Sequence, residues 1–153
     1  MIKKQILEDL NIAIKNKNKE SISTIRLMLS AIKDKEILIR SDKKIKEITE
    51  EMIFNIFKNM IKQRNESVEM YKKGNRPELV DKENNEISVI KKYLPDQLSN
   101  NDMEKICNEL IEELNANAMS DMGKVMNALK KHKLSSQIDI AKASSYVKVV
   151  LNN

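Results

Sequence analysis

Apolar residues recur every three or four positions in seven stretches of the chain, which is the spacing of one face of an α-helix. In the second stretch, for example, Ile22, Ile25, Met28, Leu29 and Ile32 follow this spacing. Polar segments without this spacing separate the stretches. The predicted helices span residues 2–16, 19–40, 50–73, 77–94, 100–115, 122–131 and 139–151.

Residues that favour helix ends stand at several of these boundaries. Thr49 and Ser99 are predicted N-caps, because a side-chain hydroxyl accepts a hydrogen bond from a free backbone N–H of the first turn. Gly74 is the predicted C-cap of the third helix. Pro77 suits a first turn and Pro95 ends a helix, since proline lacks the N–H that a helix interior needs.

The composition indicates the fold class. The chain of 153 residues has only two glycines and two prolines, although folds rich in β-strands need many turns built from these residues. We therefore predict an all-α protein of about seven helices. The best internal boundary is the segment that begins at Pro95. It divides the chain into a four-helix N-terminal domain of residues 1–95 and a small three-helix C-terminal domain of residues 96–153.

Charged side chains are distributed unevenly along the chain, whose net charge is +5. Residues 95–121 contain 1 basic and 7 acidic residues, whereas residues 122–153 contain 6 basic residues and 1 acidic residue. Two interpretations remain open: these charges compensate each other or form solvated faces, or the basic residues near His132 bind backbone phosphates. The candidate phosphate contacts are Lys124, Lys130, Lys131, Lys133 and Lys142, and secondarily Arg26 and Arg64.

Residues suited to catalysis or metal binding are scarce. His132 is the only histidine and follows a predicted helix end, and Cys107 shares a helix face with apolar residues. A dyad of these two side chains has no local support, and they cannot form a zinc site unless carboxylates supply the other ligands. The chain also lacks a glycine-rich phosphate loop and a dinucleotide fingerprint. We therefore predict no catalytic residues, no metal, no cofactor and no self-contained enzyme.

The same observations predict a location in the cytoplasm. A single cysteine fits a reducing compartment. No apolar run approaches the roughly 20 residues of a membrane-spanning helix, so we expect no membrane partner. The first ten residues lack the apolar core of a signal peptide, and with Glu8 and Asp9 they are too acidic for a typical organellar transit peptide.

Five segments match, in order, the pattern of a known family. They are Ser21–Lys33, Ile61–Ser67, Lys73–Val80, Glu86–Leu98 and Met122–Met126. Each segment alone has little specificity, but five in order across nearly the whole length make a specific match. On these segments the chain resembles the YqeY-like family, whose members contain a GatB/YqeY domain.

The resemblance implies a function and partners. The family is similar to the C-terminal tail of the GatB subunit in the tRNA-dependent amidotransferase, which amidates mischarged Glu-tRNA(Gln) or Asp-tRNA(Asn) with glutamine as the nitrogen donor. That tail is a helical module that contacts tRNA, and the catalytic steps of the enzyme take place elsewhere. The three-helix C-terminal part is therefore expected to be GatB-tail-like. The implied partners are tRNA and an amidotransferase or an aminoacyl-tRNA synthetase.

Three functional hypotheses follow. The preferred one is a tRNA-binding accessory protein related to tRNA amidotransferases, which explains the family's carbon–nitrogen ligase label. The second is a helical protein–protein adaptor without RNA binding, which an apolar surface patch far from the lysines would favour. The third is a stand-alone amidotransferase, which requires a pocket with convergent titratable groups.

One segment departs from the family pattern. Members of the family often have a stretch such as K-G-R-A-D between the last two helices, whereas this chain has Leu134-Ser135-Ser136-Gln137-Ile138 between Lys133 and Asp139. Asp139 retains the acidic position and is a predicted N-cap. The glycine and the arginine are absent, and arginine is the residue best suited to bidentate phosphate binding. This departure argues against an RNA contact in the loop itself.

Overall fold

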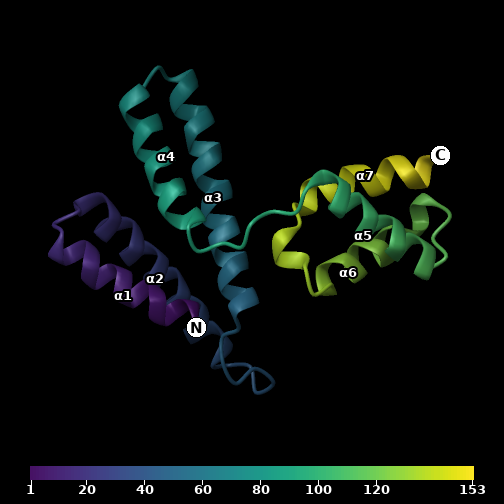
Figure 1. The fold of residues 1–153 in the computed structure, drawn as a ribbon, viewed down its shortest axis with the longest axis horizontal. Coiled ribbons are helices and arrows are strands. Elements are labelled where there is room, and N and C mark those ends of the chain that lie inside the picture. The colour runs from purple at the N-terminus through teal and green to yellow at the C-terminus, as the bar shows by residue number, and fades with distance from the viewer. The chain divides into compact units, whose positions relative to one another are not determined.

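The protein is entirely helical, as its sequence predicts. The structure, a computed structural model, describes residues 1–153 and contains seven α-helices, two short 3-10 helices and no strands (Figure 1). No helix combines the length and the apolar character needed to cross a membrane. The helices are α1 (Ile2–Lys15), α2 (Lys19–Ile39), α3 (Glu50–Lys73), α4 (Pro77–Lys91), α5 (Asn100–Glu113), α6 (Met122–Lys131) and α7 (Ile140–Asn152), and the 3-10 helices are η1 (Met119–Asp121) and η2 (Ser135–Gln137).

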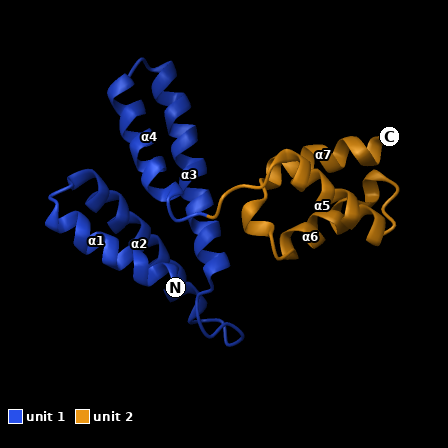
Figure 2. Ribbon diagram, viewed as in Figure 1, with its two compact units in different colours: residues 1–94 blue, residues 95–153 orange.

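The chain forms two compact units, which Figure 2 shows in different colours. Unit 1 is Met1–Leu94 and holds α1 to α4, and unit 2 is Pro95–Asn153 and holds α5 to α7. The division falls one residue before the boundary expected from the sequence. Each unit has its own cluster of buried apolar side chains.

Unit 1 consists of two helical hairpins, α1–α2 and α3–α4, whose helices are joined by three-residue connections. α2 packs against α4, which joins the hairpins. Phe57 of α3 is fully buried at the centre, and its ring lies 6.4 Å from that of Tyr93. The buried core of unit 1 is Ile6, Ala13, Ile25, Met28, Ile32, Ile53, Phe57, Met60 and Ile90.

Three helices end with a residue in the left-handed conformation, and none of the three is glycine. These residues are Lys17, Asn75 and Asn115, with φ values of 54°, 53° and 49°. After α3, the N–H of Arg76 bonds the carbonyl of Tyr71 and the N–H of Asn75 bonds that of Lys72, which is the Schellman pattern. Gly74 is the C-cap of α3, but its φ is −82°, so the left-handed position that usually takes glycine belongs to Asn75.

Two local features differ from the predicted helices. α4 ends at Lys91, three residues before the predicted end at Leu94, because the N–H groups of Tyr93 and Leu94 bond carbonyls three residues back. The residue before a proline disfavours the α conformation, so the helix tightens and ends ahead of Pro95. The second feature is η1, which was predicted as loop.

Unit 2 is a bundle in which α5, α6 and α7 each pack against the other two. The predicted N-caps Ser99 of α5 and Asp139 of α7 each accept a backbone N–H of the helix that follows, as Thr49 does for α3 in unit 1. The N–H of Leu98 donates to the carbonyl of Gln137 over 2.9 Å, which fixes the entry to α5 against η2. The buried core of unit 2 is Met103, Ile106, Cys107, Ala116, Val125, Leu129, Ile138, Ala143, Val147 and Leu151.

Candidate nucleic-acid interface

Four of the candidate phosphate contacts lie at one end of unit 2. Lys130 and Lys131 occupy the last turn of α6, Lys133 follows it, and Lys142 lies in the first turn of α7. Only residues 132–139 connect α6 to α7, so these lysines are brought to the same end of the bundle. All four side chains are exposed, and none belongs to an ion pair. We call these four residues the lysine end of unit 2.

Lys124 lies apart from the lysine end. It is six residues before Lys130 on α6, which corresponds to about 9 Å along the helix axis. Its Nζ lies 3.9 Å from Asp121 Oδ1. The pKa of the Asp121 carboxyl is lowered mainly by hydrogen bonds from the backbone N–H groups of Asn117 and Ala118, with a smaller contribution from Lys124. Lys124 is therefore partly engaged at the start of its own helix.

Most acidic residues of unit 2 lie on α5, but Asp139 lies at the lysine end as the N-cap of α7. Glu109, Glu112 and Glu113 of α5 are exposed, and none of them forms an ion pair with a lysine of α6 or α7. The only ion pair in unit 2 joins Asp121 and Lys124. The structure therefore shows no direct pairing of the two charged sets and agrees with the other half of the first interpretation, that they form solvated faces. Both sets face solvent, and the lysine end keeps its positive charge unpaired.

The loop between α6 and α7 uses its own backbone donors. The N–H of Leu134 bonds Nδ1 of His132 over 3.1 Å, and the N–H groups of Ser135 and Gln137 bond carbonyls within the loop. Such internal pairing leaves these donors unavailable for an anion. Phosphate binding at this end would therefore depend on lysine side chains, in agreement with the loss of the family's glycine and arginine.

Cys107 is a core residue, as predicted. Its side chain is fully buried in the centre of unit 2. Burial raises the pKa of the Cys107 thiol, and the charge of Glu104 raises it further. The thiol therefore stays protonated at neutral pH, whereas a nucleophilic cysteine needs a stabilised thiolate. With Nδ1 of His132 engaged by Leu134, the structure offers no support for a Cys–His dyad.

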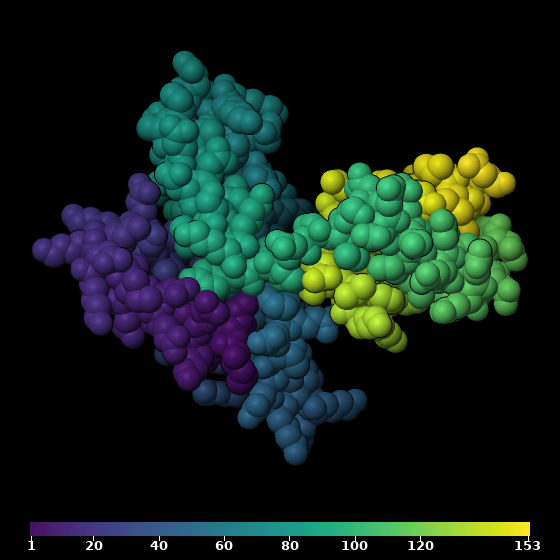
Figure 3. All heavy atoms as spheres, viewed as in Figure 1, coloured from purple at the N-terminus to yellow at the C-terminus, as the bar shows by residue number.

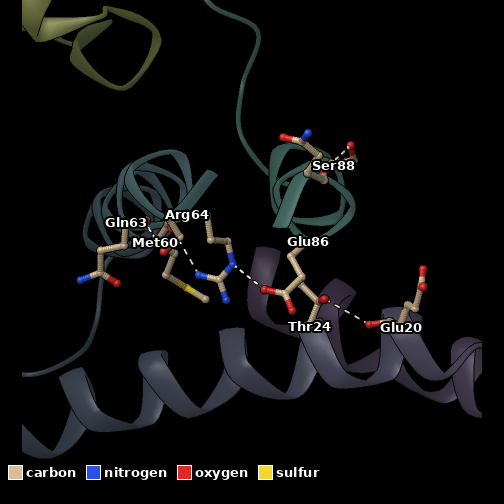
Figure 4. A network of polar contacts seen from close by, with 9 residues as sticks. Glu20, Thr24, Met60, Gln63, Arg64, Glu86 and Ser88 are labelled. Carbon is tan, nitrogen blue, oxygen red and sulfur yellow. Dashed lines mark hydrogen bonds and ion pairs between the residues drawn. The ribbon is translucent and has the colours of Figure 1, made fainter. Parts of the chain in front are cut away.

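The two arginines predicted as secondary contacts belong to unit 1 and differ in their surroundings. Arg26 is exposed on α2 and forms no ion pair. Arg64 of α3 donates from Nε to Glu86 of α4 over 2.8 Å and from Nη1 to the carbonyl of Met60 (Figure 4). The side chains of Arg64 and Glu86 are only 13% and 15% exposed. A phosphate could reach Arg64 only by displacing Glu86, so the structure makes Arg64 a link between α3 and α4.

Sequence reasoning placed Arg64 and Glu86 in matching segments but missed their pairing. They lie 22 residues apart on different helices, so no local spacing connects them. In Figure 4 the Glu86 carboxylate lies beside Thr24 of α2, which is 1% exposed and donates its hydroxyl to the carbonyl of Glu20. The pair therefore sits where three helices meet.

A cavity of about 250 Å³ lies between the start of α2 and α4. Lys19, Glu20, Lys82 and Glu86 supply its charged lining, and Glu86 is already paired with Arg64. No histidine or cysteine lines the cavity, and no group of three His, Cys, Asp or Glu side chains in the chain could hold a metal ion. Serine and threonine hydroxyls also line the cavity, but none is hydrogen-bonded to a lysine or carboxylate side chain, so the hypothesis of a stand-alone amidotransferase gains no support from it.

The comparison with protein families decides the classification. Residues 3–151, nearly the whole chain, match the family described as Yqey-like protein. The chain belongs to this family. The resemblance noted on five segments is thereby confirmed, and it covers both units of the YqeY-like protein.

Several yeast proteins are related to the chain. Each of the following is called "Altered inheritance of mitochondria protein 41, mitochondrial". The protein of Vanderwaltozyma polyspora is 36% identical over 122 residues, which cover 75% of this chain and 63% of the relative. The protein of Lachancea thermotolerans is 39% identical over 87 residues, which cover 57% of this chain and 44% of the relative. The protein of Saccharomyces cerevisiae strain YJM789 is 34% identical over 113 residues, which cover 72% of this chain and 58% of the relative. The aligned region thus spans about half of these relatives' own length.

These relatives contradict the predicted cytoplasmic location. Their names describe them as mitochondrial proteins, so the prediction of a cytoplasmic protein is wrong by this comparison. The prediction rested on one cysteine, on the lack of a long apolar run and on the acidic character of the first ten residues. The first two features fit any compartment in which a protein needs neither a disulfide nor a membrane span, and they do not discriminate among such compartments.

Proposed function

We propose that this YqeY-like protein is a tRNA-binding accessory protein that contacts the phosphate backbone of folded RNA through the lysine end of unit 2. The observation that supports this most directly is the set of four exposed, unpaired lysines at one end of unit 2, where the carboxylate of Asp139 is engaged as the N-cap of α7. Such clusters attract backbone phosphates without reading the base sequence. The resemblance of this unit to the amidotransferase tail makes tRNA the first RNA to test.

The aromatic residues favour folded over single-stranded RNA. Proteins that bind single strands stack bases on exposed rings. Phe57 is fully buried, and the other four aromatic side chains are only partly exposed. Tyr146, the only aromatic residue of unit 2, donates its hydroxyl to Asn108 over 3.0 Å. Contacts to backbone and shape, which suit structured RNA, therefore fit this surface better than base stacking.

The test is a binding titration with bulk tRNA over a series of salt concentrations, with unstructured RNA of equal length as control. Replacing the four lysines of the lysine end by Gln should weaken tRNA binding by roughly tenfold to a hundredfold at 0.1 M salt and reduce the slope of log K against log salt by about 3. Because Lys124 is partly engaged by Asp121, Lys124→Gln should have a smaller effect. Equal affinity for tRNA and unstructured RNA would contradict the proposal.

A matched pair of variants separates position from charge. Lys131→Gln with Lys133→Gln removes two charges from the lysine end. Lys105→Gln with Lys148→Gln removes two exposed, unpaired charges elsewhere in unit 2. Only the first pair should weaken tRNA binding. Equal losses in both would mean that net charge alone governs the interaction.

A second candidate function, a protein–protein adaptor, is favoured by the exposed apolar residues of the α1–α2 hairpin. Ile14, which helical spacing places on the same face as the buried Ile6, is 45% exposed, and Leu27 is 46% exposed. Both line an open groove in unit 1 together with Ile22, and Lys19, Ser23 and Arg26 form the rest of its lining. The partners to test are a purified tRNA-dependent amidotransferase and an aminoacyl-tRNA synthetase. Ile14→Ser with Leu27→Ser should abolish binding of such a partner and leave tRNA binding unchanged.

A further inference from the structure

α2 carries a row of basic residues at intervals of seven. Lys19, Arg26, Lys33 and Arg40 are all exposed, and the C-cap Arg40 keeps helical backbone angles of φ −60° and ψ −27°. Seven residues make nearly two helical turns, so the four side chains lie on almost one line, with a drift of about 20° per step. The positions between them on the same face are Ser23, Ser30 and Ile37, all exposed. We call these seven residues the α2 ridge.

The cations of the ridge are free to bind a ligand. None of Lys19, Arg26, Lys33 and Arg40 belongs to an ion pair. Of the acidic residues of α2, Glu36 pairs with Lys3 of α1, and the exposed Asp34 adjoins the ridge, four residues after Ser30 and three before Ile37. The opposite face of α2 buries Ile25, Met28 and Ile32 in the core of unit 1, so the ridge faces solvent.

The loop after α2 extends this positive surface. Lys43, Lys44 and Lys46 are exposed and unpaired, and the loop projects beyond the ends of α2 and α3 (Figures 1 and 3). The loop has a defined shape, because Asp42 accepts the N–H of Lys44 through its carboxylate and that of Ile45 through its carbonyl. The carboxylate of Asp42 is therefore engaged with the backbone of the loop.

We propose that the α2 ridge and these loop lysines form a second RNA-binding surface, which follows the phosphate backbone of a helical RNA. Successive cations lie about 10 Å apart, and the ridge is about 30 Å long, so only an extended polyanion could contact all of them. The serines between the cations add hydroxyl donors, which also bind phosphate oxygens. The inference rests on the proposed function for its ligand class, RNA, but it uses none of the lysines of unit 2.

The composition of the ridge distinguishes RNA from an acidic protein. Protein interfaces bury an apolar centre, and Ile37 is the only apolar residue of the ridge. The exposed Leu27 and Leu38 lie about 100° around the helix from the line of cations, although Leu27 shares a groove with Lys19, Ser23 and Arg26. A surface of alternating cations and hydroxyls matches a repeating phosphate backbone better than the mixed surface of a folded protein.

The first experiment compares two variants of the full chain with equal charge. The ridge variant is Lys19→Gln, Arg26→Gln, Lys33→Gln and Arg40→Gln. The control variant changes four exposed, unpaired lysines on α1, α3 and α4: Lys4→Gln, Lys62→Gln, Lys73→Gln and Lys91→Gln. The probe is an RNA duplex longer than about 30 Å, titrated over a salt series. The ridge variant should bind on the order of tenfold or more weakly at 0.1 M salt, with a slope lower by about 3. The control should bind like the wild type, and equal losses in both variants would overturn the inference.

A second pair of variants keeps every lysine and arginine in place. Ser23→Glu with Ser30→Glu puts two negative charges on the ridge, and Ser67→Glu with Ser88→Glu puts two on α3 and α4. Only the first pair should weaken binding of the duplex. Poly-glutamate of the same total charge should compete poorly. If it displaces the duplex as well as RNA does, the ridge is a general polyanion surface and the assignment to RNA fails.

The outcomes for the two surfaces can be told apart. If the ridge variant loses binding and the variant of the lysine end does not, the inference stands and the site of the proposed function falls. If only the variant of the lysine end loses binding, the proposed function stands and the inference is overturned. Failure of the wild-type protein to bind either tRNA or the duplex would overturn both.

Discussion

The two units present positive charge in different ways. Unit 1 contains 21 basic and 15 acidic residues, whereas unit 2 contains 7 and 8. Unit 2 is therefore slightly negative as a whole, and its basic surface exists because most of its carboxylates lie on α5, whereas most of its lysines lie on or next to α6 and α7. The α2 ridge arises instead from a seven-residue spacing on one long helix. The net charge of a unit therefore says little about where a polyanion could bind. The binding surface depends on where the fold places the charged side chains.

The interiors of the two units differ as well. Unit 1 encloses an ion pair of Arg64 and Glu86 at the meeting point of three helices. Unit 2 has a core of apolar residues and Cys107 without any buried ion pair. Unit 1 should therefore be sensitive to the loss of one polar partner, whereas unit 2 should be sensitive to its helix caps and apolar packing.

The largest predicted effect is that of Glu86→Ala, which leaves the guanidinium of Arg64 mostly buried and unpaired. We expect unit 1 to lose about 3 kcal/mol of stability. Replacing both partners, with Arg64→Met and Glu86→Leu, should restore most of it, because no buried charge remains. Hydrogen exchange of α3 and α4 measures the loss, and α5 to α7 serve as an internal control. A single variant as stable as the wild type would mean that the pair contributes nothing.

The next effect concerns Tyr93, whose hydroxyl donates to Asp9 over 2.6 Å and so ties the end of α4 to α1. Tyr93→Phe should cost unit 1 about 2 kcal/mol, since a hydrogen bond to a charged group is lost. Burial raises the pKa of Tyr93 above its usual value of 10, and the hydrogen bond to Asp9 and the charge of Asp9 raise it further.

This shift predicts a pH dependence. Because the folded state holds the proton more tightly than the unfolded chain, the stabilisation is fully present below about pH 10 and decreases as the pH rises above it. Denaturant unfolding between pH 8 and pH 11 measures the decrease, and the Phe variant should show less of it. Parallel curves for the two proteins would refute the assignment to Tyr93.

Removing a helix N-cap has a smaller effect, which should lower the melting temperature of the small unit 2 more than that of the larger unit 1. Asp139→Ala removes the carboxylate that accepts the N–H groups of Ala141 and Lys142 at the start of α7. The loss should be about 1 kcal/mol, which lowers the melting temperature of a unit this small by roughly 4–8 °C. Thr49→Ala removes the equivalent cap of α3 in unit 1 and should lower its melting temperature less. Scanning calorimetry of both variants makes the comparison.

The smallest effects are stabilising. Lys17→Gly should stabilise unit 1 by up to about 1 kcal/mol, because glycine adopts the left-handed conformation without the steric cost of a Cβ. Asn115→Gly should stabilise unit 2 by less, since asparagine tolerates this conformation better than lysine. The midpoints of urea unfolding measure both. A destabilising glycine at either position would show that the gain in flexibility of the unfolded chain outweighs the relieved strain.

The sequence predicted the helices well because their signals are local. The apolar spacing is a property of the helix itself, and the caps Thr49, Ser99 and Asp139 lie directly before the helices that they start. The exposure of Ile14 could not be predicted, because spacing alone does not tell how much of a helix face the neighbouring helices cover. Asn75, and not Gly74, adopts the left-handed conformation after α3. The sequence could not reveal this, because a helix that ends one residue later has the same composition and the same apolar spacing.

The candidate site was less predictable than the fold. The pairing of Arg64 with Glu86 depends on how α3 and α4 pack, which no spacing in the sequence reveals. The regular interval of the α2 ridge, by contrast, was present in the sequence at Lys19, Arg26, Lys33 and Arg40. Only the structure shows that all four are exposed and unpaired.

The single cysteine, Cys107, can report the transient local opening of unit 2. A thiol-specific reagent can reach the fully buried Cys107 only when unit 2 opens, so the labelling rate reports how often that happens. Unit 1 has no cysteine, so its opening does not contribute to the labelling. The opening of one half of the molecule can therefore be timed with no engineered label, and a bound ligand that clamps unit 2 closed would be detected as slower labelling.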